Sequence, residues 1–102
     1  MRKYSSKRRS IFECYRDVLS TLYYNCDRTI PKMRLMYATN LSSKVFNKIL
    51  TNLISLGMIR IEKVPGERRR VYIVLLPLGI ETYNGINKYL NMLGLESTIM
   101  EE

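Results

Sequence analysis

A chain of 102 residues, of which 46% are hydrophobic, has room for one small globular domain with a single packed core. Seventeen Lys and Arg residues against nine Asp and Glu residues give a formal net charge of +8, which attracts a polyanion such as nucleic acid or an anionic membrane surface. The lack of histidine, with only two cysteines, excludes a zinc site and a disulfide framework, and the longest apolar run is too short to cross a bilayer.

The positive charge is unevenly distributed along the chain. Residues 1–76 hold sixteen basic and five acidic residues, a net charge of +11, whereas residues 77–102 hold one basic and four acidic residues, a net charge of −3. Between Arg28 and Ile61 there are six basic residues and no acidic one. The basic start runs into an amphipathic pattern and not into an apolar secretory segment, so we expect a soluble, cytoplasmic protein.

Residues 1–9 contain five basic residues and nothing to bury, which predicts a disordered basic arm. Such an arm can follow a phosphate backbone or enter a minor groove. The residues that would make these contacts are Lys7, Arg8 and Arg9. A solubilising tail or a targeting signal would have the same composition, and both readings stay open here.

Two helices are predicted before residue 40. Apolar residues recur at helical spacing from Ser10 to Tyr24, with Ser10 as the N-terminal cap. A shorter helix is predicted to begin near Pro31, with Thr29 as its cap. The residues of this second helix that we expect to face the core are Ile30, Met33, Met36 and Tyr37, and those that we expect to face solvent are Lys32 and Arg34.

The segment from Ser42 to Leu56 is predicted to be the functional helix. Its apolar residues at three- and four-residue steps are Val45, Phe46, Ile49, Leu50, Leu53, Ile54 and Leu56. Ser42 can cap its first turn, and Gly57 can take the left-handed conformation that ends it. Its opposite face carries cations, an amide and a hydroxyl without any carboxylate, at Lys44, Asn47, Lys48 and Thr51. Such a stripe suits phosphates and base edges, although the solvated face of an ordinary core helix has the same pattern.

The connection between the second and third helices is very short, which makes the two helices cross steeply. Asn40 tolerates the left-handed backbone conformation that such a corner often needs, and Leu41 would fill the angle between the helices. A short helix, a tight corner and a longer helix with a basic stripe form a helix-turn-helix, in which the second helix enters the major groove.

After Gly57 the pattern changes to the alternation of a β-strand. Strands are predicted over residues 58–63 and 71–76, and Pro65 and Gly66 suit the central positions of a type II turn. The hairpin would present basic residues at its tip, which we assign to a wing on the phosphate backbone or in the minor groove. These residues are Lys63, Arg68, Arg69 and Arg70. An ordinary charged loop is the alternative.

Pro77 is predicted to start a last helix that ends near Gly94, and residues 95–102 are expected to fray as an acidic tail. One side of this helix is apolar and would either cover the first helix or form half of a dimer contact. The residues of this side are Ile80, Tyr83, Ile86, Leu90 and Leu93. The expected fold is therefore mainly α with a small β-hairpin, a winged helix-turn-helix over residues 10–76 followed by a helix over residues 77–94.

The stretch MRLMYATNLSSKVFNKILTNLISLGMI, preceded by a basic SKRR arm, resembles the small winged-helix DNA-binding proteins of crenarchaeal chromatin and of related archaeal and viral regulators. The resemblance covers Ser6 to about Tyr89 and includes the junction LLPLGIETY. It implies a homodimer on double-stranded DNA without a cofactor, a recognition helix over residues 43–56 and a wing over residues 63–70. The chromatin members have a longer last helix, and Leu76 stands where the family usually has a capping threonine.

We expect a protein that binds double-stranded DNA, and a sequence-specific transcription regulator more than a non-specific compacting protein. Lys44 and Lys48 would contact phosphates or guanine, and Asn47 would pair with adenine. Ser43 and Thr51 would read base edges or help to position the helix. A winged-helix adaptor for an acidic protein partner is the alternative from another class. A membrane surface and RNA rank lower.

An enzyme is not expected. The sequence has no histidine, no paired carboxylates, no nucleophile motif and no phosphate-binding glycine loop. Neither a metal nor a small-molecule ligand is indicated, and we expect no cofactor. The tyrosines are expected mostly to pack in the core.

Overall fold

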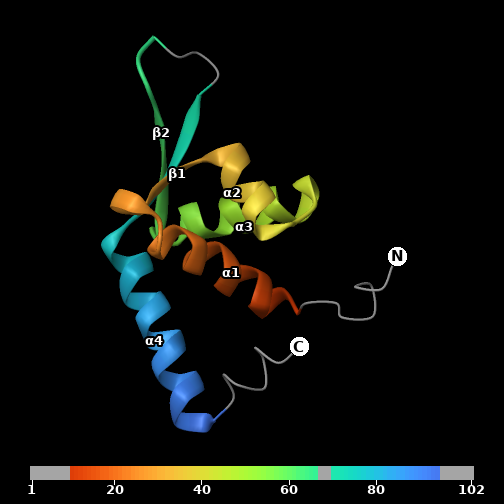
Figure 1. The fold of residues 1–102 in the computed structure, drawn as a ribbon, viewed down its shortest axis with the longest axis vertical. Coiled ribbons are helices and arrows are strands. Elements are labelled where there is room, and N and C mark those ends of the chain that lie inside the picture. Colours follow the sequence, from red (N-terminus) through yellow and green to blue (C-terminus); the bar gives the residue numbers. More distant parts are fainter. Residues whose placement is uncertain (1–9, 67–69, 95–102) are drawn as a thin grey trace.

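In a computed structural model, residues 10–66 and 70–94 form four helices and a small antiparallel sheet (Figure 1), and only these residues are described below. The helices are α1 (Ile11–Tyr23), α2 (Lys32–Thr39), α3 (Ser43–Ser55) and α4 (Pro77–Leu93), with a short 3-10 turn η2 (Cys26–Arg28). The strands are β1 (Thr29–Pro31), β2 (Ile59–Lys63) and β3 (Val71–Leu75). The winged helix-turn-helix architecture is thus confirmed. The basic arm, the acidic tail and the hairpin residues Arg68 and Arg69 lie outside the described residues.

The ends of α1 and α3 follow the local chemistry of their sequences. Ser10 and Glu13 form a reciprocal capping box at α1, with the Glu13 backbone N–H donating to Ser10 Oγ at 3.1 Å and the Ser10 N–H donating to Glu13 Oε1 at 2.9 Å. Ser42 Oγ accepts from the backbone N–H of Val45 at 3.3 Å and caps α3. Gly57, at φ 80°, takes the left-handed conformation directly after α3. These three signals are confirmed.

The helix α2 differs from the prediction in both its start and its inward face. Residues 29–31 form strand β1, so α2 begins at Lys32, and neither Thr29 nor any other side chain caps it. The prediction assigned the inward-facing positions of this helix by counting helical turns from Ile30. That count is wrong, because Ile30 belongs to a strand. The buried residues of α2 are Leu35 and Thr39, whose hydroxyl donates to the Leu35 carbonyl oxygen at 2.9 Å. Consequently Met33 and Tyr37, predicted to face the core, are 50% and 71% exposed.

The sheet has the order β1-β3-β2, with β3 in the centre and both pairings antiparallel. Ile73 of β3 lies opposite Ile30 of β1 on one side and Ile61 of β2 on the other. The predicted hairpin is confirmed. β1 is an additional strand, and it pairs with the edge of β3 that β2 leaves free. Figure 1 shows the far part of the β2–β3 hairpin extending away from the helices, as the wing of this fold does.

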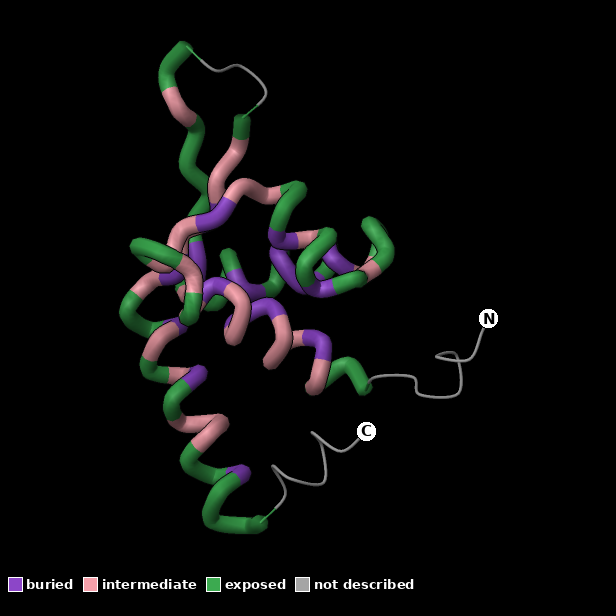
Figure 2. Tube along the Cα trace, in the orientation of Figure 1, coloured by how far each residue is buried: buried purple, intermediate pink, exposed green. Residues whose placement is uncertain are grey.

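The core lies where α1, α2, α3 and the sheet meet (Figure 2). Its fully buried large side chains are Val18, Leu19, Leu22, Leu35, Phe46, Ile49, Leu53, Ile59 and Ile73. Cys14 of α1 is also buried. Each helix of the helix-turn-helix therefore has one side fixed by packing, and its other side is presented to solvent in a defined orientation.

The turn between α2 and α3 has the geometry that steep crossing requires. Asn40 has φ 55° and ψ 41°, a left-handed conformation, and its backbone N–H donates to the Tyr37 carbonyl oxygen at 3.1 Å. Leu41 packs against the core cluster as predicted. The turn is thus fixed both by the left-handed backbone conformation of Asn40 and by the packing of the Leu41 side chain.

Gly79 in the first turn of α4 allows this helix to approach the end of the hairpin. A Cβ atom at this position would press on the Met58 carbonyl oxygen and lie 2.6 Å from Leu75 Cδ1. Replacement of Gly79 by alanine is therefore expected to lower the free energy of unfolding by about 2–3 kcal/mol, because backbone atoms cannot move aside cheaply. The measurement is urea denaturation followed by circular dichroism.

Gly85, two turns further along α4, is the matched control. No atom lies within 4 Å of an added Cβ there, and its φ is not positive. Gly85→Ala should raise the free energy of unfolding by about 0.5–1 kcal/mol, the usual gain of alanine over glycine inside a helix. Equal effects of the two substitutions would contradict the close approach at Gly79.

Candidate nucleic-acid interface

The polar stripe of α3 is fully presented to solvent. Lys44, Asn47, Lys48 and Thr51 are all exposed, as predicted, while the opposite face of the helix lies in the core. The buried residues of that opposite face are Phe46, Ile49, Leu50 and Leu53. Because packing fixes α3 by this side, the stripe has one orientation relative to the rest of the domain.

The two lysines of the stripe are uncompensated within the described residues. Neither Lys44 nor Lys48 forms an ion pair or a side-chain hydrogen bond there, and α2 and α3 contain no acidic residue. A cation without a partner keeps its full attraction for an external anion, whereas a paired one must first break its contact. The face is therefore suited to an acidic surface or a phosphate backbone.

The stripe is longer than predicted. Ser55 follows Thr51 by four residues, is exposed, and lies on the same side of α3; its hydroxyl donates to the Asn52 carbonyl oxygen at 2.8 Å. The helical spacing alone could have identified it. Two residues assigned to the apolar face, Ile54 and Leu56, are 39% and 56% exposed, because they lie at the end of α3 beyond the reach of the core.

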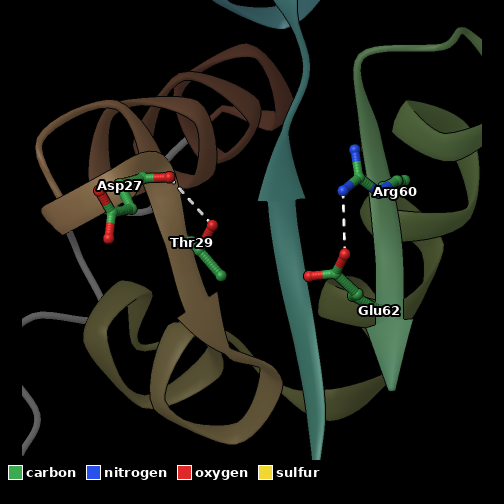
Figure 3. A network of polar contacts seen from close by, with 4 residues as sticks. All are labelled: Asp27, Thr29, Arg60 and Glu62. Carbon is green, nitrogen blue, oxygen red and sulfur yellow. Dashed lines mark hydrogen bonds and ion pairs between the residues drawn. The ribbon is translucent and has the colours of Figure 1, made fainter. Parts of the chain in front are cut away.

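Among its described residues, the wing has an ion pair on β2. Arg60 and Glu62 lie two residues apart on β2, hence on the same face, and their side chains pair at 2.9 Å with about half of each exposed. Figure 3 shows this pair on the opposite side of β3 from Thr29, whose hydroxyl donates to the Asp27 carbonyl oxygen at 2.9 Å. The charge of Arg60 is therefore neutralised locally and adds little to the cationic surface.

The predicted wing residues that the structure describes are Lys63 and Arg70, and both are exposed. Lys63 ends β2 opposite Val71, and Arg70 immediately precedes β3 and donates weakly to the Tyr72 hydroxyl at 3.5 Å. Both residues lie at the ends of the two strands that are away from α4. The hairpin can thus bring cations to a surface that extends beyond α3.

The helix α2 contributes a mixed surface beside α3. Arg34 is exposed as predicted, whereas Lys32 is half-buried. The exposed Met33 and Tyr37, which the sequence pattern had placed in the core, lie on this outer side of α2. In a helix-turn-helix the first helix crosses the backbone of the duplex, so this surface is available for phosphate and sugar contacts.

The helix α4 packs on α1 through a tyrosine cluster. Tyr83 is 5% exposed, its ring centroid lies 4.8 Å from that of Tyr23, and its hydroxyl donates to Ser20 Oγ at 3.2 Å. Burial raises the pKa of the Tyr83 phenol, but hydrogen bonds with Asn87, Ser20 and Tyr24, together with the positive charge of Arg16, outweigh burial and leave that pKa below its usual range. These contacts support the predicted role of α4 as a cover on α1.

The apolar side of α4 is largely covered within the single chain. Tyr83 and Leu90 are buried, Ile80 and Ile86 pack against the core, and Leu93 is 69% exposed. Of the five predicted dimer residues, Leu93 alone is thus fully available to a second chain. Further along α4, Tyr89 and Met92 are also strongly exposed, at 63% and 68%. Tyr24 is another exposed tyrosine, in contrast to the predicted packing role.

Within residues 10–66 and 70–94, no group of three or more Cys, Asp or Glu side chains could hold a metal ion. None of the helices in that part of the chain is long and apolar enough to span a bilayer.

Comparison with known proteins identifies relatives by structure only. No protein-family model matches the sequence, and no curated protein matches it. Among solved structures, the MarR family transcriptional regulator Sco3205 from Streptomyces coelicolor, in complex with DNA, is 20% identical with a TM-score of 0.63, over 68% of this chain and 43% of that chain. The S. aureus MepR–DNA complex is 17% identical with a TM-score of 0.69, over 86% and 70% of the two chains.

The transcriptional regulator PA4135 is also similar, with 18% identity and a TM-score of 0.73 over 96% of this chain and 68% of that chain. This chain spans only about half the length of several of these regulators, 43%, 52% and 56% in three of them. At these identities the likeness concerns the backbone arrangement. The chain has the winged helix-turn-helix fold that is also found in MarR-family transcriptional regulators.

Proposed function

We propose that this protein is a sequence-specific transcription regulator that binds double-stranded DNA, with α3 in the major groove and the β2–β3 wing on the backbone or in the minor groove. The observation that carries the proposal is the exposed, uncompensated stripe of Lys44, Asn47, Lys48 and Thr51 on the second helix of a helix-turn-helix. Solved structures of similar fold, described as complexes with DNA, support it.

Each residue of the interface has a role that follows from its chemistry. Lys44 and Lys48 contact phosphates or guanine, and Ser43, Thr51 and Ser55 donate or accept at the groove edge. On α2, the residues assigned to the backbone are Lys32 and Arg34. On the wing they are Lys63 and Arg70, together with Arg68 and Arg69, and on the arm they are Lys7, Arg8 and Arg9; the last five lie outside the described residues.

The experiment that tests the function is a selection of bound duplexes from a random pool, followed by affinity measurements on the selected and on random duplexes at one salt concentration. A regulator should prefer the selected duplex by on the order of 1,000-fold or more. Equal affinities would instead identify a compacting protein. Absence of duplex binding at low salt would contradict the proposal and favour an adaptor for an acidic protein, because phosphate contacts must strengthen as salt falls.

Asn47 is expected to determine specificity at one base pair. Its amide can pair bidentately with adenine, and a pairing of this kind is worth about 1–3 kcal/mol against the wrong base. Asn47→Ala should therefore reduce discrimination at a single position of the selected duplex by on the order of 5- to 100-fold, and leave affinity for random DNA nearly unchanged. Asn84, exposed on α4, provides the matched control, and its replacement by alanine should change neither quantity.

We further propose that the protein acts as a homodimer in the cytoplasm, where it meets DNA. The exposed apolar end of α4, formed by Tyr89, Met92 and Leu93, is the surface that supports association. Light scattering of the free protein, with Met92→Glu as the disruptive variant, tests this assignment. The origin among archaeal or viral winged-helix proteins that the sequence resemblance implies is part of the same proposal, and it rests on that resemblance alone.

A further inference from the structure

A hydrogen bond joins α1 to the recognition helix at the molecular surface. The Asn52 side-chain amide donates to the Tyr15 hydroxyl oxygen at 2.6 Å, between residues that lie 37 positions apart in the sequence. The Tyr15 ring packs against the core cluster, so its hydroxyl is held at a fixed place while it reaches the surface. This bond is a polar link between α1 and α3.

The pair lies at the border of the polar stripe. Asn52 follows Lys48 by four residues, which places it about 40° around the α3 axis from Lys48, on the side that faces α1. Asn52 is exposed and directly follows Thr51. The Tyr15–Asn52 pair therefore borders the surface that the stripe presents to solvent.

The hydrogen-bonding capacity of the pair is only partly used. The Tyr15 oxygen accepts from Asn52, while the Tyr15 proton has no acceptor among residues 10–66 and 70–94. The second amide hydrogen of Asn52 also has no acceptor there. The reverse arrangement, with the hydroxyl donating to the amide oxygen, would leave both amide hydrogens free. In either arrangement the pair offers hydrogen-bond donors and no formal charge.

We propose that Tyr15 and Asn52 together bind one phosphate of the DNA at the edge of the groove that α3 enters. A phosphate oxygen only accepts hydrogen bonds, which matches two outward donors, and hydroxyl and amide groups are common phosphate ligands in DNA complexes. The contact fixes the position of α1 on the backbone and thereby sets how deeply α3 enters the groove. This inference rests on the proposed DNA binding and adds α1 to the interface.

A neutral phosphate contact has a different signature from a lysine contact. Lysines neutralise phosphates and release counterions, so their loss reduces the salt dependence of binding, whereas the loss of a hydroxyl donor does not. Tyr15→Phe keeps the ring and removes only the hydroxyl. We expect it to weaken binding to the selected and the random duplex alike by about 10-fold, with an unchanged salt slope. Tyr24→Phe, at an exposed position directly after α1 and beside Tyr83 of α4, is the matched control and should bind as the wild type does.

A phosphate contact can be separated from a purely structural role by changing the DNA. Single phosphates of the selected duplex are replaced in turn by uncharged methylphosphonates, and both wild type and Tyr15→Phe are titrated. At one phosphate the wild type should lose affinity while Tyr15→Phe loses little more, because the contact is already absent. Additive losses at every phosphate would overturn the inference, as would wild-type affinity of Tyr15→Phe.

The stability of Tyr15→Phe and Asn52→Ala, measured by urea denaturation, completes the test. A variant that binds less only in proportion to its unfolded fraction would assign the bond to stability and overturn the phosphate contact. If the wild type fails to bind duplex DNA at all, the proposed function and this inference fall together. If the wild type binds and Tyr15→Phe binds equally well, the inference alone is wrong.

Discussion

Replacement of Phe46 by alanine is expected to lower the free energy of unfolding by about 3–5 kcal/mol, the usual cost of removing a fully buried aromatic side chain. Phe46 is 0% exposed and lies on the inner face of α3, where it fills the space between the helices. Small domains have stabilities on the order of 5–15 kcal/mol, so this loss removes a large part of the total. Urea denaturation of wild type and variant measures it.

The matched control is Phe12, the other phenylalanine of the chain. It lies in the first turn of α1 and is 43% exposed, so Phe12→Ala leaves a smaller gap that solvent can fill. Its cost should stay below about 1.5 kcal/mol. A cost at Phe46 no larger than that at Phe12 would mean that α3 is not held by its inner face, and the orientation of the polar stripe would then have no structural basis.

The sequence was sufficient to place α1, α3 and α4 because each has both a periodic apolar face and a terminal signal. Ser10 and Ser42 cap their helices by side-chain hydrogen bonds, and Pro77 opens α4 while Gly94, at φ 71°, ends it. These signals act over three or four residues, a range that spacing in the sequence describes directly. The predicted bounds agree with the structure to within a residue or two.

The failure at α2 has a specific physical cause. Residues 29–31 are extended because they pair with β3, a contact to residues more than forty positions away that local spacing does not reveal. The strand shifts the first residue of α2 to Lys32, which turns Leu35 inward and Tyr37 outward. An error of about one residue in phase rotates a helix by about 100°, which accounts for the misassignment of Met33 and Tyr37. Ile30 is buried and Met36 packs against the core, as predicted.

The features of the candidate site also divide into those that local spacing predicts and those that depend on contacts between distant segments. The stripe on α3 follows from helical spacing, and its exposure is a consequence of the buried face opposite. The Tyr15–Asn52 bond depends on how α1 crosses α3, and the Arg60–Glu62 pair depends on the pleat of β2. Of these two contacts, only the Arg60–Glu62 pair could be inferred from the alternation of side chains along one strand. Contacts between distant segments required the structure.

The double replacement of Lys44 and Lys48 by alanine is expected to weaken binding to all duplexes by on the order of 10- to 100-fold at moderate salt, since two charge-assisted contacts are lost. The plot of log affinity against log salt should become shallower by about two units, roughly 0.9 for each phosphate no longer neutralised. Both side chains are exposed and unpaired among the described residues, so the fold should be unaffected. Filter binding or fluorescence anisotropy at four or five salt concentrations measures both quantities.

Two further variants separate charge from position. Lys88→Ala removes one exposed lysine from α4, away from the stripe, and should leave the salt slope unchanged. Lys44→Arg with Lys48→Arg keeps both charges on α3 and should retain the slope while altering preference at guanine, because arginine binds its O6 and N7 bidentately. Unchanged affinity of the double alanine variant, with its fold intact, would remove α3 from the interface. No other described helix presents two unpaired cations four residues apart on one face.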